Sequence, residues 1–134
     1  MKPVVLFLCT GNSARSQMAE GLLRATASSR FETASAGTDP AAAIHPLAVE
    51  AMREIGIDIS AQRPKSVKEI LGRVPARHLV VVCDDANRAC PTTFPGVLTR
   101  DVWPIEDPAR LASMEAFRRA RDEIRSRIDA WLAT

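Results

Sequence analysis

Residues 4–15 read VVLFLCTGNSAR, and this stretch decides the fold. Positions 4–8 form a continuous apolar run, which is typical of a strand that is buried on both faces. A Gly-Asn-Ser sequence at 11–13 interrupts the run, and between 13 and 27 the apolar residues recur at helical spacing. The stretch therefore predicts a buried strand, a tight turn and a helix.

The remainder of the chain alternates between the same two patterns. Further strands are predicted at 31–36, 78–82 and 97–103, and further helices at 46–55, 66–71 and 114–131. Because strands alternate with helices and the central strands lack polar alternation, we expect an α/β fold of three layers. In this fold a central four-stranded parallel sheet is flanked by helices on both faces. A length of 134 residues suits one domain, covering 1–134, around one hydrophobic core.

The composition excludes several classes of protein. Hydrophobic residues make up 46% of the chain and charged residues 25%, which is typical of a folded globular protein and not of a disordered one. The net charge of +2 is too small to indicate a nucleic-acid partner. No apolar run approaches the roughly 20 residues of a membrane span, and the N-terminal apolar stretch lacks the length and cleavage site of a signal peptide. We therefore expect a cytoplasmic monomer with no membrane partner.

The turn after the first strand has the features of an oxyanion-binding loop. Ligands of parallel α/β sheets bind beyond the carboxyl ends of the strands, and Cys9 directly follows the first predicted strand. Gly11 allows the positive φ that a tight loop needs. Backbone N–H groups of the loop can point inward at an anion, and the first turn of the helix adds unpaired donors and a positive dipole end. The residues that would form this cradle are Thr10, Gly11, Asn12, Ser13, Ala14 and Arg15.

Three side chains in or beside this loop indicate chemistry as well as binding. Arg15 can curl back and bind two oxygens of a tetrahedral oxyanion with its planar fork. The same positive field favours the thiolate of Cys9, because such settings lower the pKa of a thiol to roughly 3.5–7.5. Ser16 can donate a hydrogen bond to that sulfur. A thiolate that faces a bound oxyanion is a nucleophile ready for in-line attack.

At these residues the sequence resembles a known family. The segment CTGNSARSQMAEG at 9–21 resembles the active-site loop of thioredoxin-coupled arsenate reductases, which are built on the low-molecular-weight protein tyrosine phosphatase fold. The likeness continues at 58–60, 83–91 and 103–108, so it covers nearly the whole chain. It implies arsenate as the substrate, phosphate or sulfate as competing anions, thioredoxin as the electron donor, and no cofactor.

Asp107 and Pro108 precede the last predicted helix, and the residues alone allow two roles for Asp107. An Asp-Pro pair at this place is typical of a helix N-cap followed by proline at the first helical position. The resemblance implies instead that Asp107 is the general acid, which gives a proton to the oxygen that leaves the oxyanion. Asp101 is the alternative proton donor.

Two further cysteines stand close together, and Cys83 follows the third predicted strand at the same edge of the sheet as Cys9. If the segment between Cys83 and Cys90 is helical, their Cα atoms are roughly 10 Å apart. A disulfide needs about 4.4–6.8 Å, so bonding the two would require the segment to unwind. They are either two packing thiols on a surface turn or a redox pair.

The resemblance implies a relay through the three cysteines. Cys9 attacks arsenate, Cys83 then attacks the Cys9 sulfur, and arsenite leaves as a Cys9–Cys83 disulfide forms. Cys90 next attacks Cys83 and frees Cys9, and thioredoxin reduces the resulting Cys83–Cys90 disulfide.

Some reductases of this family bind a potassium ion behind the loop, and here the sequence departs from them. Asn12, Glu20 and Ser35 match ligands of that ion. Arg63 and Lys65 stand where those reductases have Thr and Asp, and an ammonium group at 65 could take the place of the metal and neutralise Glu20. We therefore predict no metal and no potassium requirement. The alternative is that Lys65 is an ordinary surface charge.

Three other functions remain open at this point. A phosphotyrosine phosphatase would share the loop, Arg15 and Asp107, and weak phosphatase activity is expected because the cradle is shared. However, Ala109 and Arg110 stand where phosphatases of this family have aromatic residues that flank the substrate ring. A reductase that uses glutaredoxin or mycothiol would differ only in its electron donor. A module that senses phosphate or redox state would form the disulfide but no arsenite.

Overall fold

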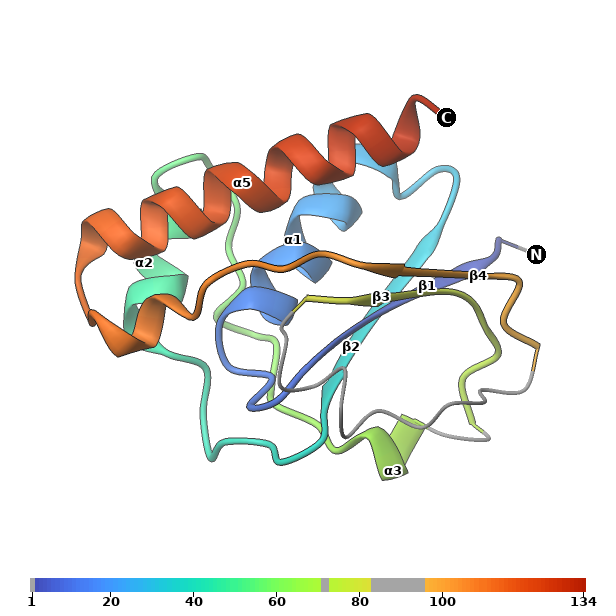
Figure 1. Ribbon diagram of the computed structural model, residues 1–134, viewed down its shortest axis with the longest axis horizontal. Coiled ribbons are helices and arrows are strands. Elements are labelled where there is room, and N and C mark those ends of the chain that lie inside the picture. Colours follow the sequence, from blue (N-terminus) through green and yellow to red (C-terminus); the bar gives the residue numbers. More distant parts are fainter. Residues whose placement is uncertain (1, 71–72, 83–95) are drawn as a thin grey trace.

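The computed structural model describes residues 2–70, 73–82 and 96–134. Its strands are β1 (Val4–Cys9), β2 (Glu32–Gly37), β3 (Ala76–Val81) and β4 (Thr99–Val102), and its helices are α1 (Arg15–Ala27), α2 (Pro46–Arg53), α3 (Val67–Ile70), the 3₁₀ helix η1 (Pro108–Arg110) and α5 (Met114–Leu132) (Figure 1). Every strand pair is parallel and the order is β2-β1-β3-β4, so the predicted four-stranded parallel sheet is confirmed. None of the helices in these ranges has the length and apolar character to span a bilayer.

β1 lies in the middle of the sheet, and all six of its residues are buried. Side chains of a strand alternate between its two faces. Val5 and Phe7 join the core formed with α1, α2 and α5, whereas Leu6 and Leu8 pack with residues of α3. Because both faces are covered, the strand needs apolar residues at every position, which explains the unbroken run in the sequence.

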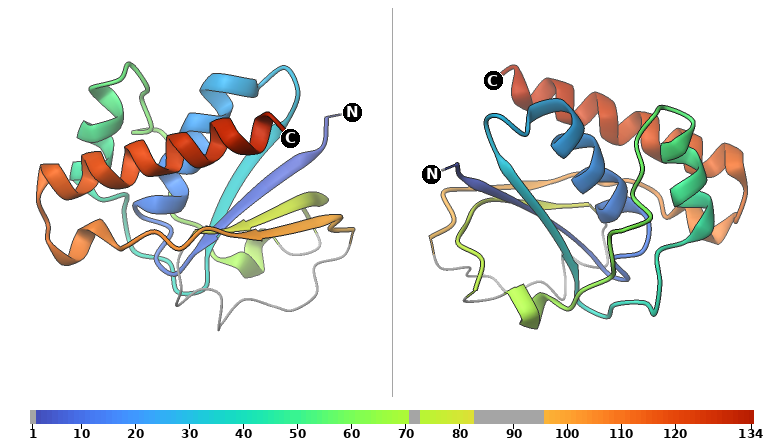
Figure 2. Two further views of the ribbon diagram at one scale, coloured as in Figure 1. Left: turned by 45° about the horizontal axis from the view of Figure 1, so that its top comes forward. Right: turned by 180° about the vertical axis from the view of Figure 1, so that it is seen from behind.

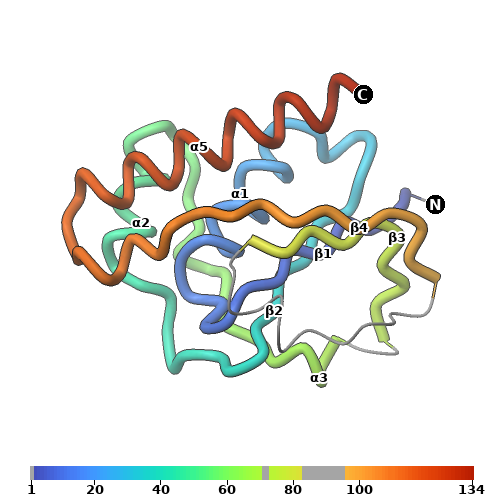
Figure 3. The backbone as a smooth tube through the Cα atoms, in the orientation of Figure 1, coloured from blue at the N-terminus to red at the C-terminus, as the bar shows by residue number. Residues whose placement is uncertain are grey.

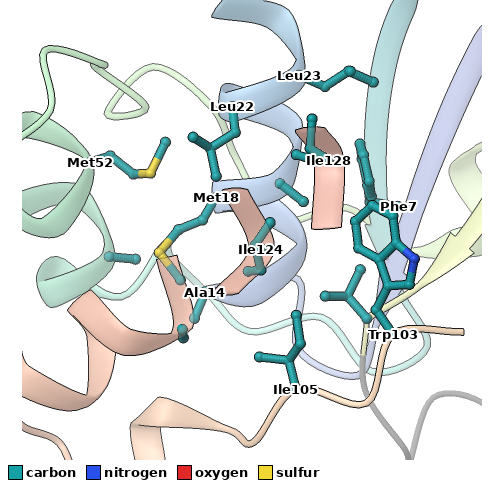
Figure 4. Packing of buried hydrophobic residues seen from close by; sticks show 14 of the residues in the cluster. Phe7, Ala14, Met18, Leu22, Leu23, Met52, Trp103, Ile105, Ile124 and Ile128 are labelled. Atoms are coloured by element: carbon teal, nitrogen blue, oxygen red, sulfur yellow. The ribbon is translucent and has the colours of Figure 1, made fainter. Parts of the chain in front are cut away.

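The helices are divided unequally between the two faces of the sheet. α1, α2 and α5 cover one face, and α3 lies against the other (Figure 1, Figure 2). In the larger core Phe7 packs against Trp103, with ring centroids 6.0 Å apart, and Met18 and Ile124 extend the cluster between the helices (Figure 4). This packing fixes α1 beside β1, so that the helix begins where the strand ends.

The predicted ends of the strands and helices differ from the observed ones mainly at the sheet edge. A strand was expected over 97–103, but β4 spans only Thr99–Val102 and has mostly exposed residues. Among the described strands β4 pairs only with β3, so it forms the edge of the sheet. Its side chains are therefore less buried than those of a central strand. Trp103 follows β4 and still donates its N–H to the carbonyl of Val81 at 2.7 Å.

An ion-pair cluster joins α5 to the end of α2. Arg121 is buried in the otherwise apolar face of α5, and its Nη1 donates to the carbonyl of Ala51 and to Oε1 of Glu54, both at 2.8 Å. Arg118, one turn earlier in α5, donates to both carboxylate oxygens of Glu54. These hydrogen bonds, first from Arg118 and then from Arg121, lower the pKa of Glu54 from its usual value of 4.5 to about 2.

We expect Glu54→Gln to lower the melting temperature in a pH-dependent way. The depressed pKa means that the Glu54 carboxylate stabilises the fold above about pH 4.5 and loses this effect as the pH falls toward 2. Thermal unfolding of both proteins should therefore differ most at pH 6 and progressively less below pH 4.5. The exposed Glu32→Gln serves as a control. A difference in melting temperature that stays constant from pH 6 to pH 3 would contradict this account.

Candidate active site

The sulfur of Cys9 lies at the carboxyl end of β1, close to two hydrogen-bond donors from the described part of the chain. Cys9 is only 2% exposed. The N–H of Asn12 donates to its Sγ at 3.2 Å, and the hydroxyl of Ser16 lies 2.8 Å from the same sulfur. Nδ2 of Asn12 donates to Oγ of Ser16 at 2.8 Å, which leaves the hydroxyl hydrogen of Ser16 for the sulfur. Two donors directed at one sulfur favour its thiolate form.

The segment 38–45 runs along the outside of the loop and sets the direction of its peptide groups. Four of its N–H groups donate to loop carbonyls at 2.9–3.2 Å. The donors are Thr38, Asp39, Ala41 and His45, and the acceptors are the carbonyls of Cys9, Thr10, Gly11 and Ser13. In a trans peptide the C=O and the following N–H point in opposite directions. The N–H groups of Thr10, Gly11, Asn12 and Ala14 are therefore turned away from this segment, as an anion cradle requires.

The left-handed residue of the loop is Asn12, with φ of 48°, so the expectation that Gly11 would supply the positive φ was wrong. Asparagine tolerates this conformation when its side chain is held locally. Asn12 is fully buried, and its Oδ1 accepts hydrogen bonds from Nε2 of Gln17 and from the N–H of Lys65. These two contacts hold the side chain that the conformation needs.

Gly37 also supports the loop, a role that the sequence analysis missed. A Cβ added at Gly37 would lie 2.4 Å from the carbonyl oxygen of Thr10 and 3.0 Å from Cβ of Asn12. Only glycine therefore allows β2 to approach the loop this closely. The one signal available was a glycine at the end of the strand that pairs with β1.

α1 begins with its N-terminus open toward the cavity. Its N-cap is Ala14, whose side chain makes no capping hydrogen bond, so the first N–H groups of the helix have no side-chain acceptor there. A cavity of about 260 Å³ lies at this end of the helix. Its lining is formed by Cys9, Thr10, Gly11, Asn12, Ser13, Ala14, Arg15, Asp107 and Ala109. All six residues expected to form the cradle thus line one cavity with the sulfur.

Arg15 connects the cradle with the segment that follows β4. Figure 3 shows the backbone of this segment running from β4 to α5. Its Nη1 donates to the carbonyl of Ile105 at 2.9 Å, and its Nη2 lies 3.7 Å from Oδ2 of Asp107. The Arg15 side chain is 11% exposed, and these two contacts hold its guanidinium at the cavity wall. The structure therefore brings the candidate anion-binding side chain and the candidate acid together.

Asp107 caps a different helix from the one expected. Its Oδ1 accepts the N–H of Ala109 at 3.0 Å and so caps η1, whereas Ser113 caps α5. Oδ2 remains on the cavity side, where it faces Arg15. The alternative acid, Asp101, lines a separate cavity with Trp131, so the geometry favours Asp107.

Behind the loop, Glu20 and Lys65 form an ion pair. Glu20 is 5% exposed and accepts a hydrogen bond from Oγ of Ser35 at 2.6 Å. Nζ of Lys65 lies 3.9 Å from Oε1 of Glu20 and donates to the carbonyl of Arg63 at 2.8 Å. Burial lowers the pKa of Lys65, and the Glu20 carboxylate opposes this effect.

This arrangement does not fit a potassium ion. Asn12, Glu20 and Ser35, the residues that the sequence resemblance matched to ligands of that ion, do lie near one another through these contacts. However, the ammonium of Lys65 already lies beside Glu20 and would repel a second cation. Within the described ranges, no group of three or more His, Cys, Asp or Glu side chains could hold a metal.

The predicted redox residues Cys83 and Cys90 lie outside the described residues. The preceding residue, Val82, donates its N–H to the carbonyl of Leu8 at 2.7 Å. Leu8 in turn precedes Cys9 in β1. The residue before Cys83 is therefore paired with the residue before Cys9, where the carboxyl ends of β1 and β3 meet.

Comparisons with known proteins agree with this geometry. A model of the low molecular weight phosphotyrosine protein phosphatase family matches residues 4–134. An arsenate reductase of Oceanobacillus iheyensis is 41% identical over 139 aligned positions, in an alignment that covers 99% of this chain and 97% of that protein. The solved structure of an arsenate reductase in the phosphate binding state has a TM-score of 0.82 and 30% identity, with 99% and 98% coverage. A thioredoxin-dependent arsenate reductase of Corynebacterium glutamicum has a TM-score of 0.72 and 34% identity, covering 99% of this chain and 64% of that one.

Proposed function

The chain belongs to the low molecular weight phosphotyrosine protein phosphatase family, and on this premise we propose that it is an arsenate reductase with a three-cysteine relay. The observation that carries the proposal is the Cys9 sulfur, which lies between two donors in a cavity that Arg15 and Asp107 also line. Relatives of nearly the same length that are named arsenate reductases favour this activity over ester hydrolysis. Ala109 in the cavity wall offers no aromatic surface to a phosphotyrosine ring.

Binding begins with the oxyanion entering the cavity at the start of α1. The inward N–H groups and the open helix end bind its oxygens, and the Arg15 fork binds two of them. Phosphate and sulfate have the same tetrahedral shape and compete for the site. Bound there, the central atom faces the Cys9 sulfur for in-line attack.

The first chemical step forms a bond between the Cys9 sulfur and arsenic. The thiolate, held by the N–H of Asn12 and the hydroxyl of Ser16, attacks arsenic as one oxygen leaves. Asp107 in its protonated form gives a proton to that oxygen, which departs as water. Arsenic is still in the +5 state in this adduct.

Reduction takes place in the second step. Cys83 attacks the Cys9 sulfur, the sulfur–arsenic bond breaks, and its electron pair stays on arsenic. Arsenite leaves, and the two sulfurs that lost the electrons form the Cys9–Cys83 disulfide. Cys90 then attacks Cys83, which frees Cys9 and forms Cys83–Cys90. An external dithiol reduces this last disulfide, and we propose thioredoxin, as in the related reductase of Corynebacterium glutamicum.

A phosphotyrosine phosphatase is the second candidate, because the family model and the shared cradle support it. One preparation can decide between the two. Arsenate reduction with thioredoxin, thioredoxin reductase and NADPH is measured beside hydrolysis of p-nitrophenyl phosphate. We expect thioredoxin-dependent arsenite and only slow hydrolysis. Fast hydrolysis without arsenite would overturn the reductase proposal. Arsenite formation with glutaredoxin or mycothiol but not with thioredoxin would show that thioredoxin is not the electron donor.

Cys90→Ser tests the relay itself. Without Cys90 nothing releases Cys9 from Cys83, so the reduced variant should form one arsenite per chain and then stop. Mass spectrometry of the stalled protein should find the Cys9–Cys83 disulfide. Sustained thioredoxin-driven reduction by this variant would refute the role given to Cys90.

A further inference from the structure

Lys65 lies behind the cradle, and its backbone N–H contacts the cradle residue Asn12 directly. We infer that Lys65 is a positioning residue, whose ammonium neutralises Glu20 while its backbone holds Asn12 in the conformation that binds the anion. The inference rests on the proposed function only in taking the cavity as the anion site.

Glu20 needs an internal cation. A buried carboxylate is costly unless it is paired and hydrogen-bonded. One of its partners, Arg24, has a half-exposed side chain, and Ser35 brings a hydrogen bond but no charge. The Lys65 side chain is only 17% exposed, and its Nζ lies 3.9 Å from Oε1 of Glu20. Of the two cations beside Glu20, Lys65 is therefore the one that is better shielded from solvent.

The backbone of Lys65 is joined to the loop and to β2. Its N–H donates to Oδ1 of Asn12 at 2.8 Å, and its carbonyl accepts the N–H of Gly37 at 2.7 Å. Nζ of Lys65 returns to the carbonyl of Arg63, which also accepts Nε2 of Gln17. The hydrogen bond from the Lys65 ammonium to the carbonyl of Arg63 thus constrains the backbone at 63–65, so that the Lys65 N–H is directed at Asn12.

Asn12 carries the effect to the sulfur. It is the left-handed residue of the loop, its N–H donates to the Cys9 sulfur, and its Nδ2 orients Ser16. If the Lys65 ammonium is removed, Arg24 is the one cation left of the two described beside the Glu20 carboxylate. The segment at 63–65 also loses the hydrogen bond from Nζ of Lys65 to the carbonyl of Arg63. We expect Asn12 to lose its fixed position, so that both the anion cradle and the thiolate are less stable.

The test uses Lys65→Met, which keeps the length of the side chain and removes its charge. Inorganic phosphate binding to the reduced protein, measured by isothermal titration calorimetry, should weaken about tenfold. The pH midpoint for alkylation of Cys9 by iodoacetamide, followed by peptide mass spectrometry, should rise because the thiolate has lost oriented donors. The exposed Lys68→Met is the matched control and should behave as the wild type.

Two rescue experiments separate positioning from a general loss of stability. A small monovalent cation can occupy the space left by the ammonium, so potassium or methylammonium should restore phosphate binding in Lys65→Met. Neither should affect the wild type when compared with sodium at equal ionic strength. The double variant Glu20→Gln/Lys65→Met removes both charges and should recover part of the lost affinity even if Lys65→Met folds poorly.

The inference fails if folded Lys65→Met binds phosphate as tightly as the wild type. It also fails if neither cation nor the double variant restores any binding, because the lysine would then act only through the stability of the fold. Wild-type binding that is strengthened by potassium would show that an ion, and not Lys65, balances Glu20. Phosphate binding is measured without arsenate, so these outcomes do not depend on whether the protein reduces arsenate.

Discussion

Cys9→Ser is expected to form no measurable arsenite, which corresponds to a loss of at least about 10³-fold in rate. A serine hydroxyl is not ionised at neutral pH, and its oxygen can form neither the sulfur–arsenic bond nor the disulfide that carries the electrons. The backbone cradle, the end of α1 and Arg15 do not depend on the sulfur. Phosphate should therefore bind the variant no more weakly than the wild type, as measured by calorimetry.

The matched control for this result is Cys90→Ser, which removes a different thiol and should retain one turnover. The contrast matters because a loss of arsenite in both variants would point to a general need for thiols. If Cys9→Ser still produces arsenite, another sulfur is the nucleophile and the site described here is not the centre of the reaction.

Arg15→Lys is expected to weaken phosphate binding by about tenfold to a hundredfold, and to lower kcat/KM for arsenate by about 10²-fold to 10³-fold. The guanidinium offers two parallel donors and is held at the cavity wall by the carbonyl of Ile105 and by Asp107. An ammonium is a point charge that cannot bind two oxygens in a plane. Calorimetry with phosphate and steady-state kinetics with arsenate measure the two effects.

Arg110→Lys is the control, because Arg110 is exposed on η1 beside the cavity but does not line it. It should leave both quantities within a factor of two or so of the wild type, which is usual for exposed substitutions. Equal losses in the two variants would mean that only total positive charge matters, and would contradict the two-oxygen role of Arg15.

The fold was predictable because its strongest signal is local. β1 is covered on both faces, so every position is apolar, and the run at 4–8 is recognisable without knowledge of the neighbours. β4 was predicted too long because its neighbours decide its burial: Val102 in β4 is 40% exposed and Leu98 before it is 76% exposed. The sequence shows which residues are apolar, but it does not show which strand lies at the edge of the sheet, because that depends on how the strands pair.

The site was predictable where its residues are consecutive. Cys9 and Arg15 belong to one loop, and their spacing between a strand and a helix indicates a shared cavity. Gly37 and the backbone of Lys65 were missed because their roles depend on contacts across the chain, against Thr10 and Asn12. Such contacts leave no periodic pattern in the sequence.

The direct test of the whole account is a single turnover without any external reductant. Fully reduced protein is mixed with excess arsenate, and arsenite and free thiols are then counted per chain under denaturing conditions. The relay predicts one arsenite formed and two of the three thiols lost, with Cys83 and Cys90 joined. A chain that keeps all three thiols and forms no arsenite, while it hydrolyses an aryl phosphate, would contradict it.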